Sequence, residues 1–199
     1  MTNKHVWKRS LSVWVAGAAA LLLAACAPTP QTVSLDPKPE VDEAEFDEPR
    51  TIALRVNDRR SMDIIGYRDR ERGAAINSEP ALAKAVEQGL REALMRQGYH
   101  VESWDPDAER RLDVTINRFE YERTGGFFQR VTTVEAQMDA VGKRNGQRHR
   151  AEVSSSSTDR AFLFGPSAQK NQRMISSVLD RSVSRIASEP EILRVLEAD

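Results

Sequence analysis

The sequence predicts an α+β fold: a single two-layer domain with helices on one face of a mainly antiparallel sheet. Apolar and polar residues alternate through most of residues 112–153, which is typical of long strands with one apolar and one wet face. Two segments with helical spacing of apolar residues, 79–97 and 166–187, flank that region. We expect a long three-strand meander plus an N-terminal strand, two main helices on one face and a short C-terminal helix, all within residues 51–199.

The first 25 residues differ from the rest of the chain. Lys4, Lys8 and Arg9 precede residues 11–25, which are mostly Ala, Leu and Val. A basic start followed by a short apolar run that ends in small residues is typical of a secretory signal peptide. A retained membrane-spanning anchor is the alternative, but the run is shorter than the ~20 residues that such a helix needs.

The only cysteine, Cys26, directly follows this run. Leu23 to Cys26 resembles the lipobox of bacterial lipoproteins, in which an apolar residue and two small residues precede the cysteine. The resemblance implies cleavage before Cys26, a diacylglycerol on its thiol and an acyl chain on its new amino group, with no other cofactor. Such an anchor is effectively permanent. Ala27 stands where enteric sorting rules place Asp for retention in the inner membrane, so it implies transfer to the outer membrane.

Acylation of Cys26 leaves the mature chain without a free thiol, which excludes a disulfide and cysteine-based catalysis. Removal of residues 1–25 takes away three basic residues and changes the formal net charge from −1 to −4. This balance gives no electrostatic reason to expect nucleic acid or an anionic membrane surface as a partner. We expect the protein to meet the membrane through its lipid anchor.

Residues 26–50 carry five prolines after the cysteine and an acidic run over 40–48. Prolines remove backbone donors and like charges repel, so we expect a lipidated tether that holds the domain ~25–30 Å from the lipid. The alternative is that residues 32–35, with Val33 and Leu35 alternating, add an edge strand to the domain.

The elements of the domain follow in order. Residues 51–58 predict a central strand, and a charged loop follows it. We expect Ser78 to cap the helix over 79–97, Pro80 to lie in its first turn and Gly98 to end it. The meander consists of strands over 112–123, 130–141 and 148–158, with a bulge near Arg118 and a tight turn at Asn145 and Gly146. A short terminal helix follows Ser188.

Several quoted stretches resemble the YajG family of bacterial lipoproteins. Besides the lipobox they are "VNDRR", "IGYR", "LAKAVEQGLREALMRQGYHV", "LDVTINRFEY" and "NQRMISSVLDRSVSRI". The resemblance covers most of the mature chain. It implies an α+β periplasmic domain, and it brings no enzyme chemistry that could be assigned to residues of this sequence.

Two groups of residues are candidate interaction sites. The first is a charged loop with Asp58, Arg60, Gly66 and Arg68, because loops after central strands often carry function. Its alternative, an ion pair from Asp58 that only stabilises a turn, is equally compatible with the sequence. The second group is apolar and consists of Phe127, Phe128, Phe162 and Phe164. Core closure under a loop is the favoured interpretation of this group, and a docking surface for an envelope partner is the alternative.

The sequence contains no motif of a catalytic or metal site. His100 and His149 are the only histidines of the mature chain, and no cysteine or carboxylate lies at ligand spacing around them, so we expect no metal. No nucleophile elbow, P-loop or H-E-x-x-H motif occurs.

The sequence therefore predicts an outer-membrane-anchored lipoprotein whose periplasmic domain is not an enzyme. We expect it to bind an envelope protein. The first alternative is a module that binds peptidoglycan fragments or lipids, in a cleft lined by the Phe residues. The second is an enzyme of unknown type, which would show a buried polar cluster with shifted pKa values.

Overall fold

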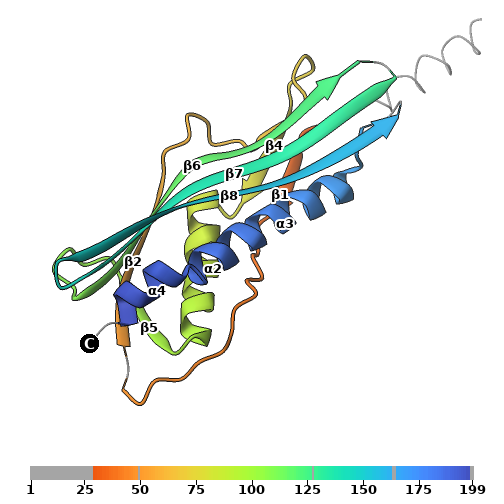
Figure 1. The fold of residues 1–199 in the computed structure, drawn as a ribbon. Helices are drawn as coiled ribbons and strands as arrows, with labels where there is room; N and C mark the ends of the chain where they lie inside the picture. The colour runs from red at the N-terminus through yellow and green to blue at the C-terminus, as the bar shows by residue number, and fades with distance from the viewer. Residues whose placement is uncertain (1–28, 49, 127, 163–164, 198–199) are drawn as a thin grey trace, which may run out of the picture.

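The computed structural model describes residues 29–48, 50–126, 128–162 and 165–197. Their strands form one curled sheet of eight strands, and the helices of the described part cover one face of it (Figure 1). This arrangement confirms the predicted α+β single domain. The elements are, in chain order, β1 (Gln31–Ser34), β2 (Arg50–Asp58), β3 (Gly66–Asp69), β4 (Ala74–Glu79), α2 (Leu82–Arg96), β5 (Tyr99–Ser103), β6 (Arg110–Gly125), β7 (Gln129–Arg144), β8 (Gln147–Phe162), α3 (Ala168–Ala187) and α4 (Pro190–Glu197).

Strands β6, β7 and β8 form the predicted antiparallel meander. Asn145 and Gly146 have positive φ angles of 48° and 81° and make the predicted tight turn between β7 and β8. The predicted bulge is also confirmed, because the register between β6 and β7 shifts between Ile116 and Arg118. Each strand has 16 residues, so the meander runs along the whole molecule (Figure 1).

The sheet is mixed rather than purely antiparallel, which corrects the prediction. The parallel pairs are β1 with β4, β2 with β5, β2 with β6 and β3 with β6. β2 and β5 are parallel because α2 carries the chain back along the sheet between them. β6 has two neighbours on one edge: β2 lies along its first half, and β3 touches it where Gly66 pairs with Tyr121.

Strands β3 and β4 lie within the segment 58–79, for which we expected a charged loop. They form a short antiparallel hairpin whose turn includes Gly73 at a φ of 65°. Ile65, Ala74 and Ile76 bury their side chains there, between many charged residues. This apolar pattern is too short to indicate strands in a sequence.

The helices lie close to their predicted positions, but α2 begins differently. Ser78 pairs with β1 as part of β4 and is not a cap, and Pro80 precedes the helix, which starts at Leu82. Ser78 and Glu79, which we expected at the start of the helix, pair instead with β1. The other end is as predicted, with Gly98 in the left-handed conformation at a φ of 86°.

Residues 31–48 lie on the domain, where we expected a tether, and we call them the strap. β1 pairs with β4 and extends the sheet, which confirms the alternative of an edge strand. Val33 and Leu35 are 0% and 2% exposed and belong to the hydrophobic core. Pro37 and Pro39 are buried as well.

The strap continues between α2 and α3 after it leaves the sheet. The backbone N–H of Lys38 donates to Oδ1 of Asp180 (2.9 Å), and that of Glu40 donates to Oγ of Ser184 (2.8 Å), both on α3. From α2, Nη1 of Arg96 donates to the carbonyl of Pro39 (2.9 Å). Proline favours the extended backbone needed here, and the helix side chains supply the partners that a neighbouring strand would otherwise give.

Candidate functional site

A cleft of about 430 Å³ lies at the end of the sheet where β3 and β6 diverge. The two strands approach closely at Gly66, where an added Cβ would lie 2.1 Å from the carbonyl oxygen of Tyr121. Beyond this contact β3 turns back into β4 while β6 continues to Gly125, so a space opens between them. The side chains that matter for its chemistry are Tyr67, Arg68, Asp69, Tyr121, Arg123 and Arg130.

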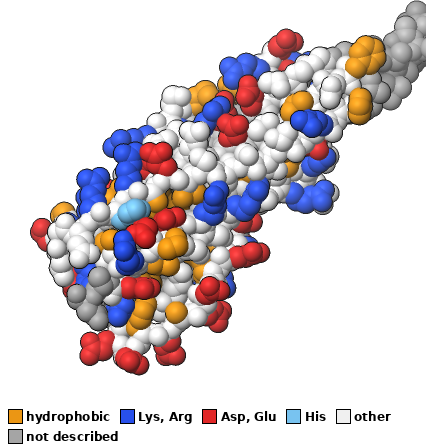
Figure 2. Space-filling view, in the orientation of Figure 1, with side chains coloured by type: hydrophobic (Ala, Val, Ile, Leu, Met, Phe, Trp, Pro, Cys, Tyr) orange, Lys and Arg blue, Asp and Glu red, His pale blue; other side chains and the backbone are white. Residues whose placement is uncertain are grey.

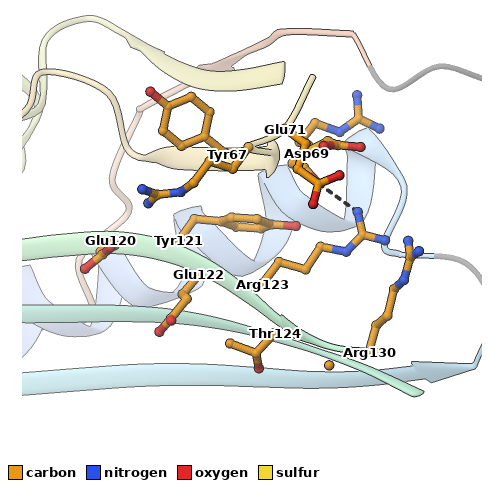
Figure 3. Close-up of a pocket in the computed structure, with 12 residues that line it drawn as sticks. Tyr67, Asp69, Glu71, Glu120, Tyr121, Glu122, Arg123, Thr124 and Arg130 are labelled. Atoms are coloured by element: carbon orange, nitrogen blue, oxygen red, sulfur yellow. Dashed lines mark hydrogen bonds between the residues drawn. The ribbon is translucent and has the colours of Figure 1, made fainter. Parts of the chain in front are cut away.

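Two arginines lie side by side in this cleft. Arg123 on β6 and Arg130 on β7 are diagonal neighbours on one face of the sheet, because Arg123 pairs with Thr132 and Arg130 with Gly125. Figure 3 shows both guanidinium groups at the same end of the cleft. Nη1 of Arg123 donates to the carbonyl oxygen of Arg68 (2.7 Å). Burial lowers the pKa of Arg123, and repulsion by Arg130 lowers it further.

Four carboxylates line the cleft, Asp69, Glu71, Glu120 and Glu122, and among the described residues no ion pair or hydrogen bond joins any of them to Arg123 or Arg130. Glu120 and Glu122 point away from Arg123, as expected for alternate residues of a strand (Figure 3). Glu120 pairs with Arg118 on that opposite face (3.0 Å). Asp69 lies nearer and attracts Arg123, but it also accepts the backbone N–H of Arg72 (3.1 Å). The cleft is therefore suited to an anion.

Buried polar side chains fix the floor of the cleft. The hydroxyl of Tyr121 donates to Oδ1 of Asn171 on α3 (3.1 Å), and Nδ2 of Asn171 donates to Oε1 of Gln31 on β1 (3.1 Å). Asn171 is 0% exposed, and burial raises the pKa of Tyr121. These bonds join β6, α3 and β1, so they hold the floor in place while the arginines face the opening.

Of the four candidate residues predicted in the charged loop, Arg68 alone lines the cleft. Arg60 forms an ion pair with Asp58 (2.7 Å) and also donates to the carbonyls of Ile64 (3.2 Å) and Phe119 (3.4 Å). Its side chain is 8% exposed, so it fastens the loop to β6 just after the bulge. Asp58 and Arg60 thus form the ion pair that the alternative interpretation of the loop proposed, and Gly66 makes the close contact with Tyr121.

Of the predicted apolar group, Phe128 and Phe162 are described, and neither is among the described residues that line the cleft. Phe128 and Phe162 are 74% and 77% exposed, so core closure is the wrong interpretation for both. They lie at the same end of the sheet, because Gln129 pairs with Phe162. Phe127 and Phe164 are outside the described residues, as are Cys26 and Ala27.

Sequence reasoning missed Tyr121, Arg123 and Arg130. A usable signal was present, since Arg123 and Arg130 stand on either side of "TGGFFQ", a segment rich in turn residues. A hairpin over that segment brings both arginines to one end of two paired strands. Their proximity to Arg68 depends on β3, which the sequence did not predict.

A second groove, of about 810 Å³, follows the strap along α3 and includes Lys38, Gln172, Asp180, Arg181 and Arg185. Its polar groups have protein partners: Arg181 and Arg185 donate to the carbonyls of Ser156 and Ser154 on β8 (2.8 and 2.5 Å). These bonds cover the free edge of the sheet. The groove is therefore a weaker candidate for a ligand than the cleft.

The comparisons with known proteins show that the chain is a bacterial lipoprotein. A family model described as uncharacterized lipoprotein, Lipoprotein_16, matches residues 37–197. The chain belongs to this family, which is the YajG family that its sequence resembles. No curated protein matches the chain.

One solved structure shares the fold at low sequence identity, and others are similar with TM-scores below 0.5. The crystal structure of an uncharacterized protein has a TM-score of 0.51 and 12% identity, covering 81% of this chain and 98% of its own. A protein from Xanthomonas campestris has a TM-score of 0.46 and 10% identity, covering 83% and 95%. Rare lipoprotein B from Shewanella oneidensis has a TM-score of 0.42 and 10% identity, covering 73% and 96%. At 12% identity the likeness to the first of these structures concerns the fold alone.

Two further findings concern the described residues. None of their helices has the length and apolar character needed to cross a membrane. They also contain no group of three His, Cys, Asp or Glu side chains arranged to hold a metal ion.

Proposed function

We propose that this chain is a lipid-anchored lipoprotein of the outer membrane whose periplasmic domain is a non-catalytic binding module for an anionic component of the envelope. One observation carries the proposal: Arg123 and Arg130 lie side by side in the cleft between β3 and β6. Among the hydrogen bonds and ion pairs of the described residues, none joins either guanidinium group to a carboxylate. Arginines in such an arrangement suit bidentate recognition of phosphate or carboxylate.

The polar and charged walls of the cleft favour a bound ligand over the protein partner expected from the sequence. Its walls are polar and charged, and none of the described residues that line it is a Phe, which differs from the cleft expected for the ligand-binding alternative. The ligand class that fits is therefore anionic rather than apolar. A pocket of this volume accommodates a small ligand or the polar part of a larger one.

A non-catalytic role is supported by the bonding of the buried polar cluster. The polar groups of Tyr121 and Asn171 are engaged with each other and with Gln31. The pKa shift of Tyr121 follows from burial, which makes its hydroxyl a poorer proton donor at neutral pH. The cluster thus suits support of the cleft better than proton transfer.

The anchoring part of the proposal rests on the lipobox, Cys26 and Ala27, together with membership of a lipoprotein family. Replacing Cys26 by Ser in cells and fractionating the envelope tests it. We expect Cys26→Ser to leave the outer-membrane fraction and to change in electrophoretic mobility. Unchanged fractionation and mobility would show that Cys26 is not the anchor.

Anion binding is tested with the mature lipoprotein in non-ionic detergent micelles at low salt. The probe is inorganic pyrophosphate, titrated by calorimetry into the wild type, Arg130→Gln and Arg148→Gln. Arg148 is the matched control, an exposed arginine at the far end of β8. We expect Arg130→Gln to bind at least about tenfold more weakly, since a hydrogen bond to a charged group contributes about 1.5–3 kcal/mol. Equal affinities of the three proteins, or no saturable binding by the wild type, would refute the assignment of the cleft.

A further inference from the structure

The described chain starts at the same end of the molecule as the cleft. Nη1 of Arg68 donates to the carbonyl oxygen of Thr29 (3.2 Å), and β1 begins two residues later. Cys26 precedes Thr29 by three residues, so their Cα atoms are at most about 11 Å apart. A lipid on Cys26 would thus keep this end of the domain close to the membrane surface, far closer than the tether expected from the sequence.

Exposed aromatic side chains occur at this end. Phe128 directly precedes β7, and Phe162, the last residue of β8, pairs in register with the next residue, Gln129. Each is about three-quarters exposed. Figure 2 shows hydrophobic side chains at the upper right end of the surface, the end to which β6 and β8 point in Figure 1. Large apolar side chains next to basic ones are typical of surfaces that lie in the interface of a bilayer.

The acidic run of the strap lies away from the cleft. Residues 40–48 lie at the opposite end of the molecule, where the N–H of Ala44 donates to the carbonyl of Arg96 (3.1 Å) near the end of α2. The cleft itself is lined by four arginines and four carboxylates, of which Glu120 and Glu122 point away from Arg123. The attraction of an anionic headgroup to this end therefore depends on Arg123 and Arg130 and not on a net positive charge.

We infer that the cleft end rests on the membrane that holds the Cys26 lipid, with Phe128 and Phe162 at the level of the headgroups and Arg123 and Arg130 against the phosphates of anionic lipids. The inference rests on the proposed anchoring and anion binding and names the ligand: an anionic phospholipid headgroup. The short connection to Cys26 favours this occupant, because lipid surrounds the anchor wherever the protein is attached. An envelope protein seated on the same residues is the competing occupant.

The test uses the lipidated protein in vesicles of phosphatidylcholine with or without phosphatidylglycerol. Because Cys26 is acylated, a cysteine introduced elsewhere is the only thiol that a nitroxide can label. Phe162→Cys places the label at the cleft end, and Arg148→Cys places it at the other end of the same strand as the control. Collision rates with oxygen and with a water-soluble nickel chelate then report whether each label meets lipid or water.

We expect the label at 162 to lose contact with the nickel chelate in vesicles with phosphatidylglycerol, and the label at 148 to keep it in both vesicles. Adding Arg130→Glu to the Phe162→Cys protein should restore the contact, whereas adding Arg148→Glu should not. Equal nickel contact at 162 and 148 in both vesicles would overturn the inference. Protection of 162 in intact cells but not in protein-free vesicles would also overturn it and would favour a protein occupant.

The two proposals fail separately. Pyrophosphate binding that depends on Arg130, combined with a label at 162 that stays in water, would leave the anion site standing and remove the membrane contact. A protected label at 162 without any pyrophosphate binding would remove the anion site and leave a membrane contact made by the aromatic side chains.

Discussion

Replacing Leu35 by Ala tests whether the strap is part of the domain. Leu35 is 2% exposed and lies in the hydrophobic core, and its backbone N–H donates to the carbonyl of Glu79 (2.9 Å). Leu→Ala changes at such positions cost about 2–5 kcal/mol, from lost burial and from the cavity left behind. The strap lies at the surface and has room to relax, so we expect a loss near 3 kcal/mol.

The assay is urea unfolding of the mature lipoprotein in micelles. Trp104, the only tryptophan left after removal of residues 1–25, is the reporter, and it packs against Arg55 at 3.9 Å from the ring centroid. With an m-value of about 2 kcal/mol/M, a loss of 3 kcal/mol lowers the unfolding midpoint by about 1.5 M. Thr32→Ala is the matched control, because Thr32 lies in β1 with its side chain exposed, and we expect a change below about 0.5 kcal/mol. Equal stability of the two variants would mean that the strap is a tether after all.

Three further substitutions test the cleft and α3. Gly66→Ala places a Cβ 2.1 Å from the carbonyl oxygen of Tyr121 and should lower the free energy of unfolding in urea by about 2–3 kcal/mol. Gly126→Ala, with no atom within 4 Å of the added Cβ, is the control and should cost far less. Similar losses in the two variants would contradict the close strand contact. Tyr121→Phe removes a buried hydrogen bond to Asn171 and should cost about 1–2 kcal/mol, and no loss would show that this bond is unimportant. Burial raises the pKa of Asp180, so the fold loses stability as the pH rises from the ordinary Asp pKa through the raised folded pKa of this carboxyl. Asp180→Asn should thus be more stable than wild type at pH 7 and equal to it near pH ~3, below the ordinary Asp pKa; a difference independent of pH would refute this explanation.

The parts of the fold that the sequence predicted are those with a long, regular apolar pattern. The meander over 110–162 alternates through most of its length, and α3 repeats its apolar residues over 20 positions. The missed parts, β3 and β4, have four and six residues and depend on partners far away in the sequence. Nothing local in a short charged segment indicates that β1 and β6 lie beside it.

The tripeptide Ser-Glu-Pro shows how distant contacts decide a local structure. At 188–190 it precedes the predicted helix, and Pro190 is the first residue of α4. At 78–80 the same letters end β4, because Ser78 pairs with Val33 of the strap. A helix therefore follows the tripeptide in both places. At 78–80, however, pairing with β1 keeps Ser78 in a strand, and the helix begins only at Leu82.

The candidate site was only partly predictable for a related reason. Arg68 was chosen because it follows a central strand, and it does line the cleft. Arg123 and Arg130 looked like ordinary polar positions of a strand and its neighbour. They become a candidate site because β3 and β6 diverge, which leaves two like charges in a cavity where, among the described residues, no ion pair joins them to a carboxylate.

The strap links these observations, because under the proposed anchoring at Cys26 its docking decides which end of the domain lies at the membrane. If residues 31–48 were free, a flexible chain of about twenty residues would let the domain present any face to the bilayer, at an average distance of ~25 Å. Docked on α2 and α3, the strap carries its acidic residues to the far end and leaves two residues, Ala27 and Pro28, between Cys26 and Thr29. The proline-rich composition that suggested a spacer thus has the opposite consequence: it brings the arginine cleft close to the anchor and moves the acidic charge away from it.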